Sequence, residues 1–325
     1  MKRIVNIASV LLLACVAFIS CEREGRPVVQ EESRPIVFAV DGEWPEITKI
    51  PIYDAETIKE TGFRVWGTWH QDSEDHASYT YDAEVFGEDG TLVSLKEGSE
   101  LLLPEQDAMW HRGYYCFAAV FPSGLAGVQV STFETTSAGE HFANTLTLDF
   151  SEDGFDLAET QTDLMYAFSN IDNSDADATT VRLDFSHAFA SLDIRITHNG
   201  AKIRSVSLYG IHDRITGHLQ LNDSDNGNLT ELLLNASVST ENAPYYYAQF
   251  DDGQDYVDET ITIVDDLLVF PETLSINTSL AIKFELQYSG KNEVLYARVT
   301  EGEWTPGSTN VYVIEVDTSK FDTTE

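Results

Sequence analysis

Residues 191–197 read Ser-Leu-Asp-Ile-Arg-Ile-Thr, and this stretch decides the fold class. Its apolar residues Leu192, Ile194 and Ile196 fall at every second position, which is the period of a strand with one buried face. The run Ser205–Ile211 continues in the same way, with Val206 and Leu208 on one side. These stretches predict half-buried strands whose sheets pack face to face.

Similar short runs recur along the chain from Ile36 onward, separated by turn signals. The expected strands are Ile36–Val40, Phe63–Trp69, Gly113–Phe121, Asn144–Phe150, Val181–Phe185, Ser191–Thr197, Ser205–Ile211, Thr260–Val264, Leu267–Phe270, Ala281–Tyr288, Val294–Thr300 and Asn310–Val316. The expected turns lie at Asp89-Gly90, Asn199-Gly200, Asn226-Gly227 and Asp252-Gly253, since glycine adopts positive φ without strain. Helical periodicity is confined to Asp54–Thr61, so a parallel α/β sheet is disfavoured.

These observations predict an all-β protein built from two antiparallel β-sandwich domains. The best boundary is the polar stretch 170–180, which is rich in turn-forming residues. It divides the folded part into an N-terminal domain over residues 35–172 and a C-terminal domain over residues 173–325, each of ordinary sandwich size.

The N-terminus carries an export signal. Lys2 and Arg3 precede an apolar run over residues 4–19 that is too short for a typical membrane-spanning helix, and Ser20-Cys21 follows it. This pattern predicts a lipoprotein signal peptide over residues 1–20, with the lipid carried by Cys21. An ordinary cleaved signal and lipidation at Cys15 are the alternatives. Residues 21–34 are polar and predict a tether between the lipid and the folded part.

The charge of the mature chain argues against polyanionic partners. Removal of residues 1–20 takes away Lys2 and Arg3, so 17 basic residues remain against 55 acidic ones, a formal charge of −38. A field of this sign repels nucleic acid and anionic membrane surfaces. Cys116 is then the one unmodified cysteine, and its apolar surroundings predict a buried, inert thiol rather than a disulfide.

No catalytic motif is present, and we expect neither a cofactor nor a metal. The chain lacks G-x-S-x-G and H-E-x-x-H elements. The spacing of His212 and His218 suggests loop residues around a turn, and His187 suggests a packed side chain at the start of a strand. A pair of glycosidase carboxylates can be neither excluded nor located among 55 acidic residues.

Two acidic loops and five tryptophans leave binding alternatives open. The loops offer calcium ligands but lack the residues that complete an EF-hand; their acidic residues are Asp172, Asp175, Asp177, Asp223 and Asp225. A sugar-stacking platform is the alternative for the tryptophans, which are Trp44, Trp66, Trp69, Trp110 and Trp304. Trp66 and Trp110 lie in or beside apolar runs, where core packing is the commoner role.

The order of several sequence blocks resembles the fimbrillin-like proteins of Bacteroidetes over most of residues 36–318. The blocks are Phe63-Arg-Val-Trp66-Gly67, Tyr114-Tyr-Cys-Phe-Ala-Ala-Val-Phe-Pro122, Gln161-Thr-Asp163-Leu-Met-Tyr166-Ala167, Leu183-Asp-Phe-Ser-His187-Ala188, Asn199-Gly200, Val206-Ser-Leu208, Gly217-His-Leu219 and Trp304-Thr-Pro-Gly307. The acidic residues Glu22 and Glu24 after Cys21 resemble the surface-export signals of lipoproteins in that phylum.

The resemblance implies two transthyretin-like sandwich domains and a structural or adhesive role in a type V pilus-like fimbrium at the outer membrane. Its partners would be other fimbrial subunits joined by strand exchange, a lipid anchor, and a host or bacterial surface receptor. In polymerising members an arginine-directed protease removes the first strand, and a strand of the next subunit fills the groove by sheet-edge pairing. A glycan-binding surface lipoprotein for nutrient capture is the alternative, and a secreted hydrolase is a weaker one.

The basic residues near the tether depart from the polymerising pattern. Arg26 and Arg34 precede proline, which makes a poor protease substrate. Arg23, Lys49 and Arg64 remain as processing sites, but cleavage at Arg23 frees no strand and Arg64 lies in a strand-like run. The sequence therefore favours an anchor, accessory or tip subunit, or a surface lipoprotein that does not polymerise, over a stalk subunit.

Overall fold

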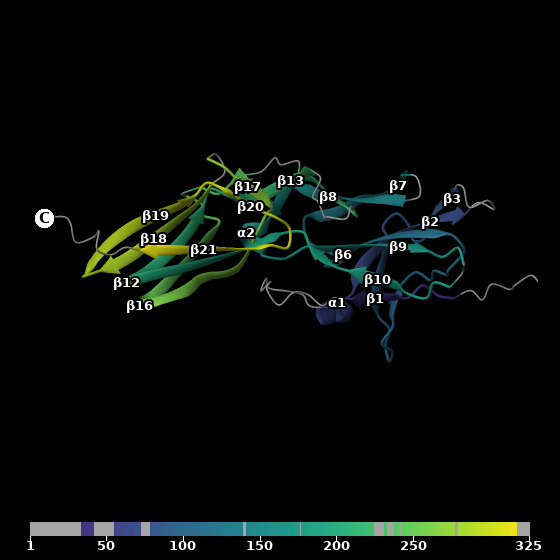
Figure 1. The fold of residues 1–325 in the computed structure, drawn as a ribbon, viewed down its shortest axis with the longest axis horizontal. Coiled ribbons are helices and arrows are strands. Elements are labelled where there is room, and N and C mark those ends of the chain that lie inside the picture. Colours follow the sequence, from purple (N-terminus) through teal and green to yellow (C-terminus); the bar gives the residue numbers. More distant parts are fainter. Residues whose placement is uncertain are drawn as a thin grey trace, which may run out of the picture. The chain divides into compact units, whose positions relative to one another are not determined.

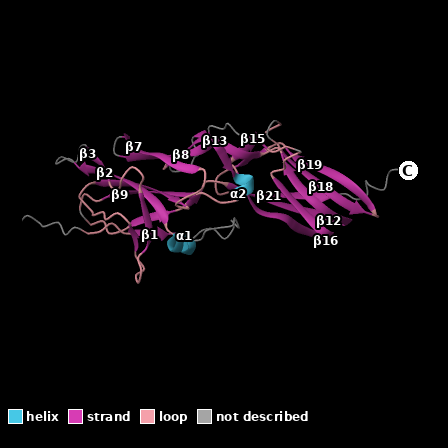
Figure 2. Ribbon diagram, turned by 180° about the vertical axis from the view of Figure 1, so that it is seen from behind, coloured by secondary structure: helices cyan, strands magenta, loops and turns pink. Residues whose placement is uncertain are grey.

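Strands make up nearly all of the regular structure (Figures 1 and 2). The computed structural model describes residues 34–41, 55–72, 79–138, 141–175, 177–223, 231–232, 237–240, 242–276 and 279–316. Within these ranges there are two short helices, α1 (Ala55–Thr61) and α2 (Leu157–Thr160). The helical turn expected near Asp54–Thr61 is confirmed as α1. No helix of the described ranges is long and apolar enough to cross a membrane.

The largest sheet has nine strands in the order β10-β1-β5-β4-β2-β6-β9-β11, with β3 paired to β2. Its strands are β1 (Phe38–Asp41), β2 (Phe63–Asp72), β3 (Tyr79–Glu84), β4 (Thr91–Leu95), β5 (Leu102–Pro104), β6 (Tyr114–Phe121), β9 (Met165–Asp172), β10 (Val181–Asp184) and β11 (Ser186–His187). We call it the first sheet.

Two five-stranded sheets and one two-stranded sheet complete the fold. The second sheet contains β7 (Val128–Ala138), β8 (His141–Asp156), β13 (His212–Asn222), β14 (Glu231–Leu232) and β15 (Ser237–Val238). The third sheet contains β12 (Ala190–Tyr209), β16 (Tyr246–Val269), β18 (Leu280–Tyr288), β19 (Lys291–Val299) and β21 (Thr309–Val316). The small sheet pairs β17 (Glu272–Leu274) with β20 (Gly302–Trp304).

Three groups of buried apolar residues form the cores. One lies on the face of the first sheet that contains Phe63 and Phe117, and a second lies against Ile194 and Ile282 of the third sheet. The remaining core joins side chains of the first and second sheets, such as Trp66 and Leu148, with Phe270. The alternation in residues 191–197 is confirmed, because Leu192, Ile194 and Ile196 are fully buried.

Strand pairing crosses the expected domain boundary at 172/173. β10 and β11 follow that boundary in sequence but pair with β1 and β9 of the first sheet. β13 likewise pairs with β8. The all-β architecture is confirmed, whereas the division into domains 35–172 and 173–325 stays a prediction.

Two of the expected turns are wrong because long strands run through them. Asn199-Gly200 lies inside the 20-residue strand β12, and Asp252-Gly253 lies inside the 24-residue strand β16. β12 pairs with β16 across this region with register shifts, so bulges absorb the residues that favour turns. The turn at Asp89-Gly90 is confirmed, with Gly90 at φ +64°, and Asn226-Gly227 lies outside the described residues.

Most strand pairs are antiparallel, but the first and last described strands pair in parallel. β1 lies parallel to β10, and β21 lies parallel to β12. Parallel neighbours cannot be joined by a tight hairpin. Both terminal strands are therefore inserted beside partners that are distant in sequence.

The prediction of a buried Cys116 is confirmed. The residue lies in β6 with no solvent exposure, and burial raises the pKa of its thiol to about 12. Since the thiolate is the reactive form, the folded protein should contain almost none of it at pH 8.

We therefore expect Cys116 to react with a thiol reagent at least about a hundredfold more slowly in the native protein than in urea. The measurement is absorbance after addition of the reagent at pH 8 to a form that begins at Glu22, in which Cys116 is the one cysteine. Equal rates in the two conditions would contradict the buried position.

Candidate functional site

The first described strand, β1, completes the core of the first sheet. Its alternate residues Phe38 and Val40, and Ile36 just before it, are at most 3% exposed. The Phe38 ring meets Phe63 edge-on at 6.1 Å and Phe117 at 5.7 Å between ring centroids. Removing β1 would therefore expose the centre of this core.

Main-chain hydrogen bonds hold β1 and the residues before it on both sides. Four residue pairs join β1 to β10, and Phe38 pairs with Leu102 of β5. Val181 N donates to Val37 O at 2.8 Å, and Ile36 N donates to Ala108 O at 2.9 Å. β1 is therefore an interior strand of the sheet, paired along its length with β10 and at Phe38 with β5.

The chain just before β1 is also fixed. Trp110 N donates to Arg34 O at 2.9 Å, and Pro35 forms an isolated bridge with Met109. The Arg34–Pro35 bond lies within this paired segment. Its position therefore adds to the resistance to protease cleavage that the proline already gives this bond.

The structure places one of the three predicted processing residues. Arg64 lies in β2 between Leu92 of β4 and Val120 of β6, and its Nη1 donates to Asp89 O at 2.9 Å. A bond inside a strand paired on both sides is closed to a protease in the folded state. Arg23 and Lys49, like the lipidation residue Cys21, lie outside the described residues.

The last described strand, β21, pairs with β12 through eight residues. Its buried side is fixed by Tyr312, whose hydroxyl accepts from Nε1 of the buried Trp304 at 2.9 Å. On the opposite side Val311 and Val313 are 43% and 57% exposed. Within the described part of the chain β12 is the one strand paired with β21, so its far edge is open.

Residues from two of the sequence blocks meet in a buried junction. Gln161 ends α2 at φ +42°; its Nε2 donates to Leu268 O at 3.2 Å, and its Oε1 accepts from Leu268 N at 2.9 Å. Asp163 forms a buried ion pair with His187, and burial raises the pKa of the Asp163 carboxyl. The prediction that His187 is a packed residue is confirmed.

The block around Trp304 reaches the same region. Gly307 N donates to Phe189 O at 2.8 Å, and its φ of +71° favours glycine. These contacts are structural, because they fasten loops of distant sequence to β16 and β12 and leave no reactive group exposed.

Among the residues that the structure describes, the other predicted histidines and calcium ligands do not join a cluster of three metal-ligating groups. His212 and His218 both lie in β13, so the predicted loop position is wrong. His212 Nδ1 lies 2.6 Å from Glu272 Oε2 in a buried pair, whereas His218 pairs with Asp149 at the surface. Asp223 accepts hydrogen bonds from Asn144 and Asn170. Asp225 lies outside the described residues.

The four described tryptophans do not form a sugar platform. Trp66, Trp110 and Trp304 are at most 7% exposed and belong to the cores. Trp69 is partly exposed, and its Nε1 donates to Arg112 O at 3.1 Å. Trp44 lies outside the described residues.

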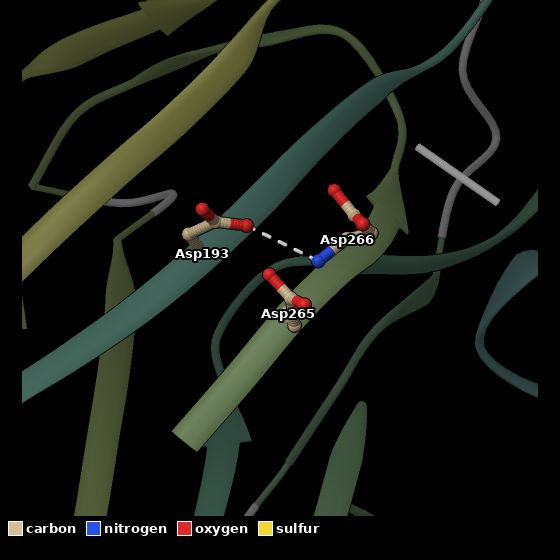
Figure 3. A group of neighbouring side chains, drawn as sticks. All are labelled: Asp193, Asp265 and Asp266. Atoms are coloured by element: carbon tan, nitrogen blue, oxygen red, sulfur yellow. Dashed lines mark hydrogen bonds between the residues drawn. The ribbon is translucent and has the colours of Figure 1, made fainter. Parts of the chain in front are cut away.

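One acidic cluster was missed by the sequence analysis. Asp193 of β12 faces Asp265 and Asp266 of β16, and one carboxylate oxygen of each lies within 4.8 Å of the others (Figure 3). Asp266 N donates to Asp193 Oδ1 at 3.1 Å, and Arg195 Nη2 lies 3.0 Å from Asp193 Oδ2. Asp266 has φ +52° in a bulge, so the cluster arises from strand register, which the sequence does not display.

The described residues therefore define an all-β protein in which the first described strand completes a core. The chain belongs to the fimbrillin-like family, whose model matches residues 39–325. This family consists of fimbrial structural and adhesion proteins, which supports the prediction of a non-enzymatic protein. No protein of curated function matches the chain.

Two solved structures of fimbrial proteins are similar to this chain. A fimbrial protein from Bacteroides vulgatus ATCC 8482 is similar at 15% identity, with a TM-score of 0.51 over 87% of this chain and 95% of that one. The fimbrial anchor protein Mfa2 from Porphyromonas gingivalis is similar at 10% identity, with a TM-score of 0.31 over 82% of each chain. The first of these supports the fold.

The Asp163–His187 pair yields a stability prediction. Asp163→Ala leaves a buried histidine without its partner and should lower the free energy of unfolding at pH 7 by about 3 kcal/mol, measured in urea. Asp149→Ala at the exposed His218 pair is the control and should cost less than about 1 kcal/mol. Equal losses would contradict a structural role for the buried pair.

The raised pKa of the Asp163 carboxyl also predicts how the free energy of unfolding changes with pH. Because its pKa is raised in the folded state, folded Asp163 holds its proton more tightly than unfolded Asp163 does. Its stability contribution is therefore fully present below the ordinary aspartate range and declines as the pH rises through the raised pKa. Relative to Asp163→Asn, the wild type should lose stability in urea titrations as the pH rises above the ordinary aspartate range; an unchanged difference would contradict the raised pKa.

Proposed function

We propose that this protein is a lipid-anchored subunit at the end of a cell-surface fimbrium, in an anchor, accessory or tip position. The lipid on Cys21 would hold it in the outer membrane through the tether. Support comes from the family, the export signal and the pairing of β1.

The observation that carries the terminal position is the combination of a buried β1 with the absence of a usable cleavage site behind it. From Pro35 to Phe63 the chain contains no arginine. The next one, Arg64, lies in a central strand. An arginine-directed protease thus has no accessible bond whose cleavage would release β1 from the folded protein.

A retained β1 determines how the subunit joins others. The groove that β1 fills cannot accept a strand from another subunit, because the main-chain bonds of β10 and β5 are already paired with β1. A subunit that cannot accept a strand in the groove of β1 cannot continue a chain of strand exchange at that groove. We therefore propose that it lies at an end of the assembly. At the membrane end its partner would be the next fimbrial subunit, and at the tip a host or bacterial surface receptor.

The glycan-binding alternative lacks a supporting observation among the described residues. It needed exposed aromatic rings on one face, and three of the described tryptophans are buried. The structural role therefore remains the better assignment.

The anchor predicts where the protein is found. Cys21→Ser should release the protein from outer-membrane fractions into the medium, and the wild-type surface protein should begin at a lipidated Cys21 in mass spectrometry. Lys49→Gln should leave both results unchanged if no processing occurs there. A mature surface chain that begins after residue 34 would refute the proposal.

The core role of β1 predicts complementation. A soluble form that begins at residue 42 loses Ile36, Phe38 and Val40, whose burial is worth roughly 1.5–3 kcal/mol each, and should fail to melt cooperatively. A synthetic peptide of residues 33–42 added in trans should restore a melting transition by calorimetry. The same peptide with Ser at positions 36, 38 and 40 should not, and a stable truncated protein without peptide would show that β1 is dispensable.

A further inference from the structure

A groove runs beside β7, away from β1. It consists of two cavities of about 490 and 400 Å³, and Trp66 lines both. One cavity follows β7 along Val128, Gln129 and Val130, and the other continues along Ser131 to Glu134. The groove thus accompanies one strand over seven consecutive residues.

Apolar side chains of the cores contribute to the floor of the groove. Trp66 belongs to the core shared by the first and second sheets, and its Nε1 donates to Glu88 O at 3.2 Å. Val120 and Leu148 extend this floor on one side of Trp66, and Phe86 and Phe133 extend it on the other. Apolar side chains inserted from outside would find preformed contacts there.

β7 presents a strand edge to this groove. Within the described part of the chain β8 is the one strand paired with it, so β7 ends the second sheet. Thr132 to Thr136 pair with β8 in regular register after a bulge at Ser131. The Thr68 and Thr135 hydroxyls, 3.0 Å apart, fix this part of β7 against β2. An extended segment could add its main-chain hydrogen bonds to β7 and place alternate side chains over Trp66.

The rim of the groove is acidic. Four exposed carboxylates line it, from Glu84, Glu88, Asp89 and Glu134. The one basic side chain that lines the cavities is Arg64, and its Nη1 donates to the main-chain oxygen of Asp89. Such a rim attracts a basic segment and repels an acidic one.

We propose that the groove along β7 is a strand-acceptor site for a partner protein. The occupant is an extended segment in which apolar residues alternate with Lys or Arg, the apolar ones facing Trp66 and the basic ones facing the rim. A second copy of this chain fits poorly, since it carries 55 acidic against 19 basic residues. The site is separate from β1, so its test stands apart from that of the proposed anchor role.

Binding of three synthetic peptides to the protein that begins at Glu22 tests the proposal. The first alternates valine with lysine over eight residues, the second replaces each lysine by glutamate, and the third keeps the composition of the first but groups its valines and lysines in separate blocks. We expect the alternating lysine peptide to bind at least about tenfold more tightly than either control in fluorescence anisotropy at 50 mM salt.

A pair of charge-reversal variants locates the site. Glu88→Lys combined with Glu134→Lys should weaken the lysine peptide at least about tenfold and strengthen the glutamate peptide. Glu301→Lys combined with Glu303→Lys, at exposed positions on and beside β20, makes the same charge change elsewhere and should leave both affinities within about twofold. Both variants change exposed side chains, and circular dichroism verifies that they fold.

Hydrogen exchange distinguishes strand addition from electrostatic adhesion. The lysine peptide should slow amide exchange in residues 128–136 by about tenfold or more, with no comparable effect on β19, another edge strand. Equal binding of the block peptide, protection elsewhere, or an unchanged affinity in the double variant would each overturn the proposal. Self-association of the peptide-free protein that the double variant abolishes would assign the groove to a second copy and overturn it as well.

Discussion

The insertion of β1 between β10 and β5 is the constraint on which the first core depends. A four-residue strand contributes few hydrogen bonds, but Ile36, Phe38 and Val40 are buried in the first core, where the Phe38 ring contacts Phe63 and Phe117. Because these residues are buried, loss of this one short N-terminal segment would destabilise the whole sheet. Whether that segment stays or leaves therefore decides whether the subunit can accept a partner strand at this place.

Side chains from two distant parts of the sequence hydrogen-bond the main chain of β16. Gln161 pairs with both main-chain groups of Leu268, as a neighbouring strand would. The hydroxyl of the buried Tyr245 also donates to Leu268 O. Residues of the sequence blocks that first suggested the family thus contact β16 and the chain just before β12. The role of these blocks is therefore to hold strands in position and not to catalyse a reaction.

Strand edges of this protein differ in what they offer a partner. The edges of β1 are filled from within the chain, whereas β21 and β7 each have an open edge. The two open edges have different surroundings: β21 presents the exposed side chains of Val311 and Val313, and β7 borders a groove with a carboxylate rim. A preformed groove gives the alternate side chains of an added strand a place to be buried, which is why we propose β7 as the acceptor.

The sequence alone determined the strand content, the buried face of residues 191–197 and the burial of Cys116, since each depends on local pattern and composition. Tertiary structure decided the rest. It kept β12 and β16 continuous through Asn199-Gly200 and Asp252-Gly253, because the pairing of the two strands on either side of these residues leaves them in bulges. It also paired His212 with Glu272, gathered the three aspartates and placed β7 beside Trp66. These features arise from contacts between residues far apart in the chain, whose register no local pattern encodes.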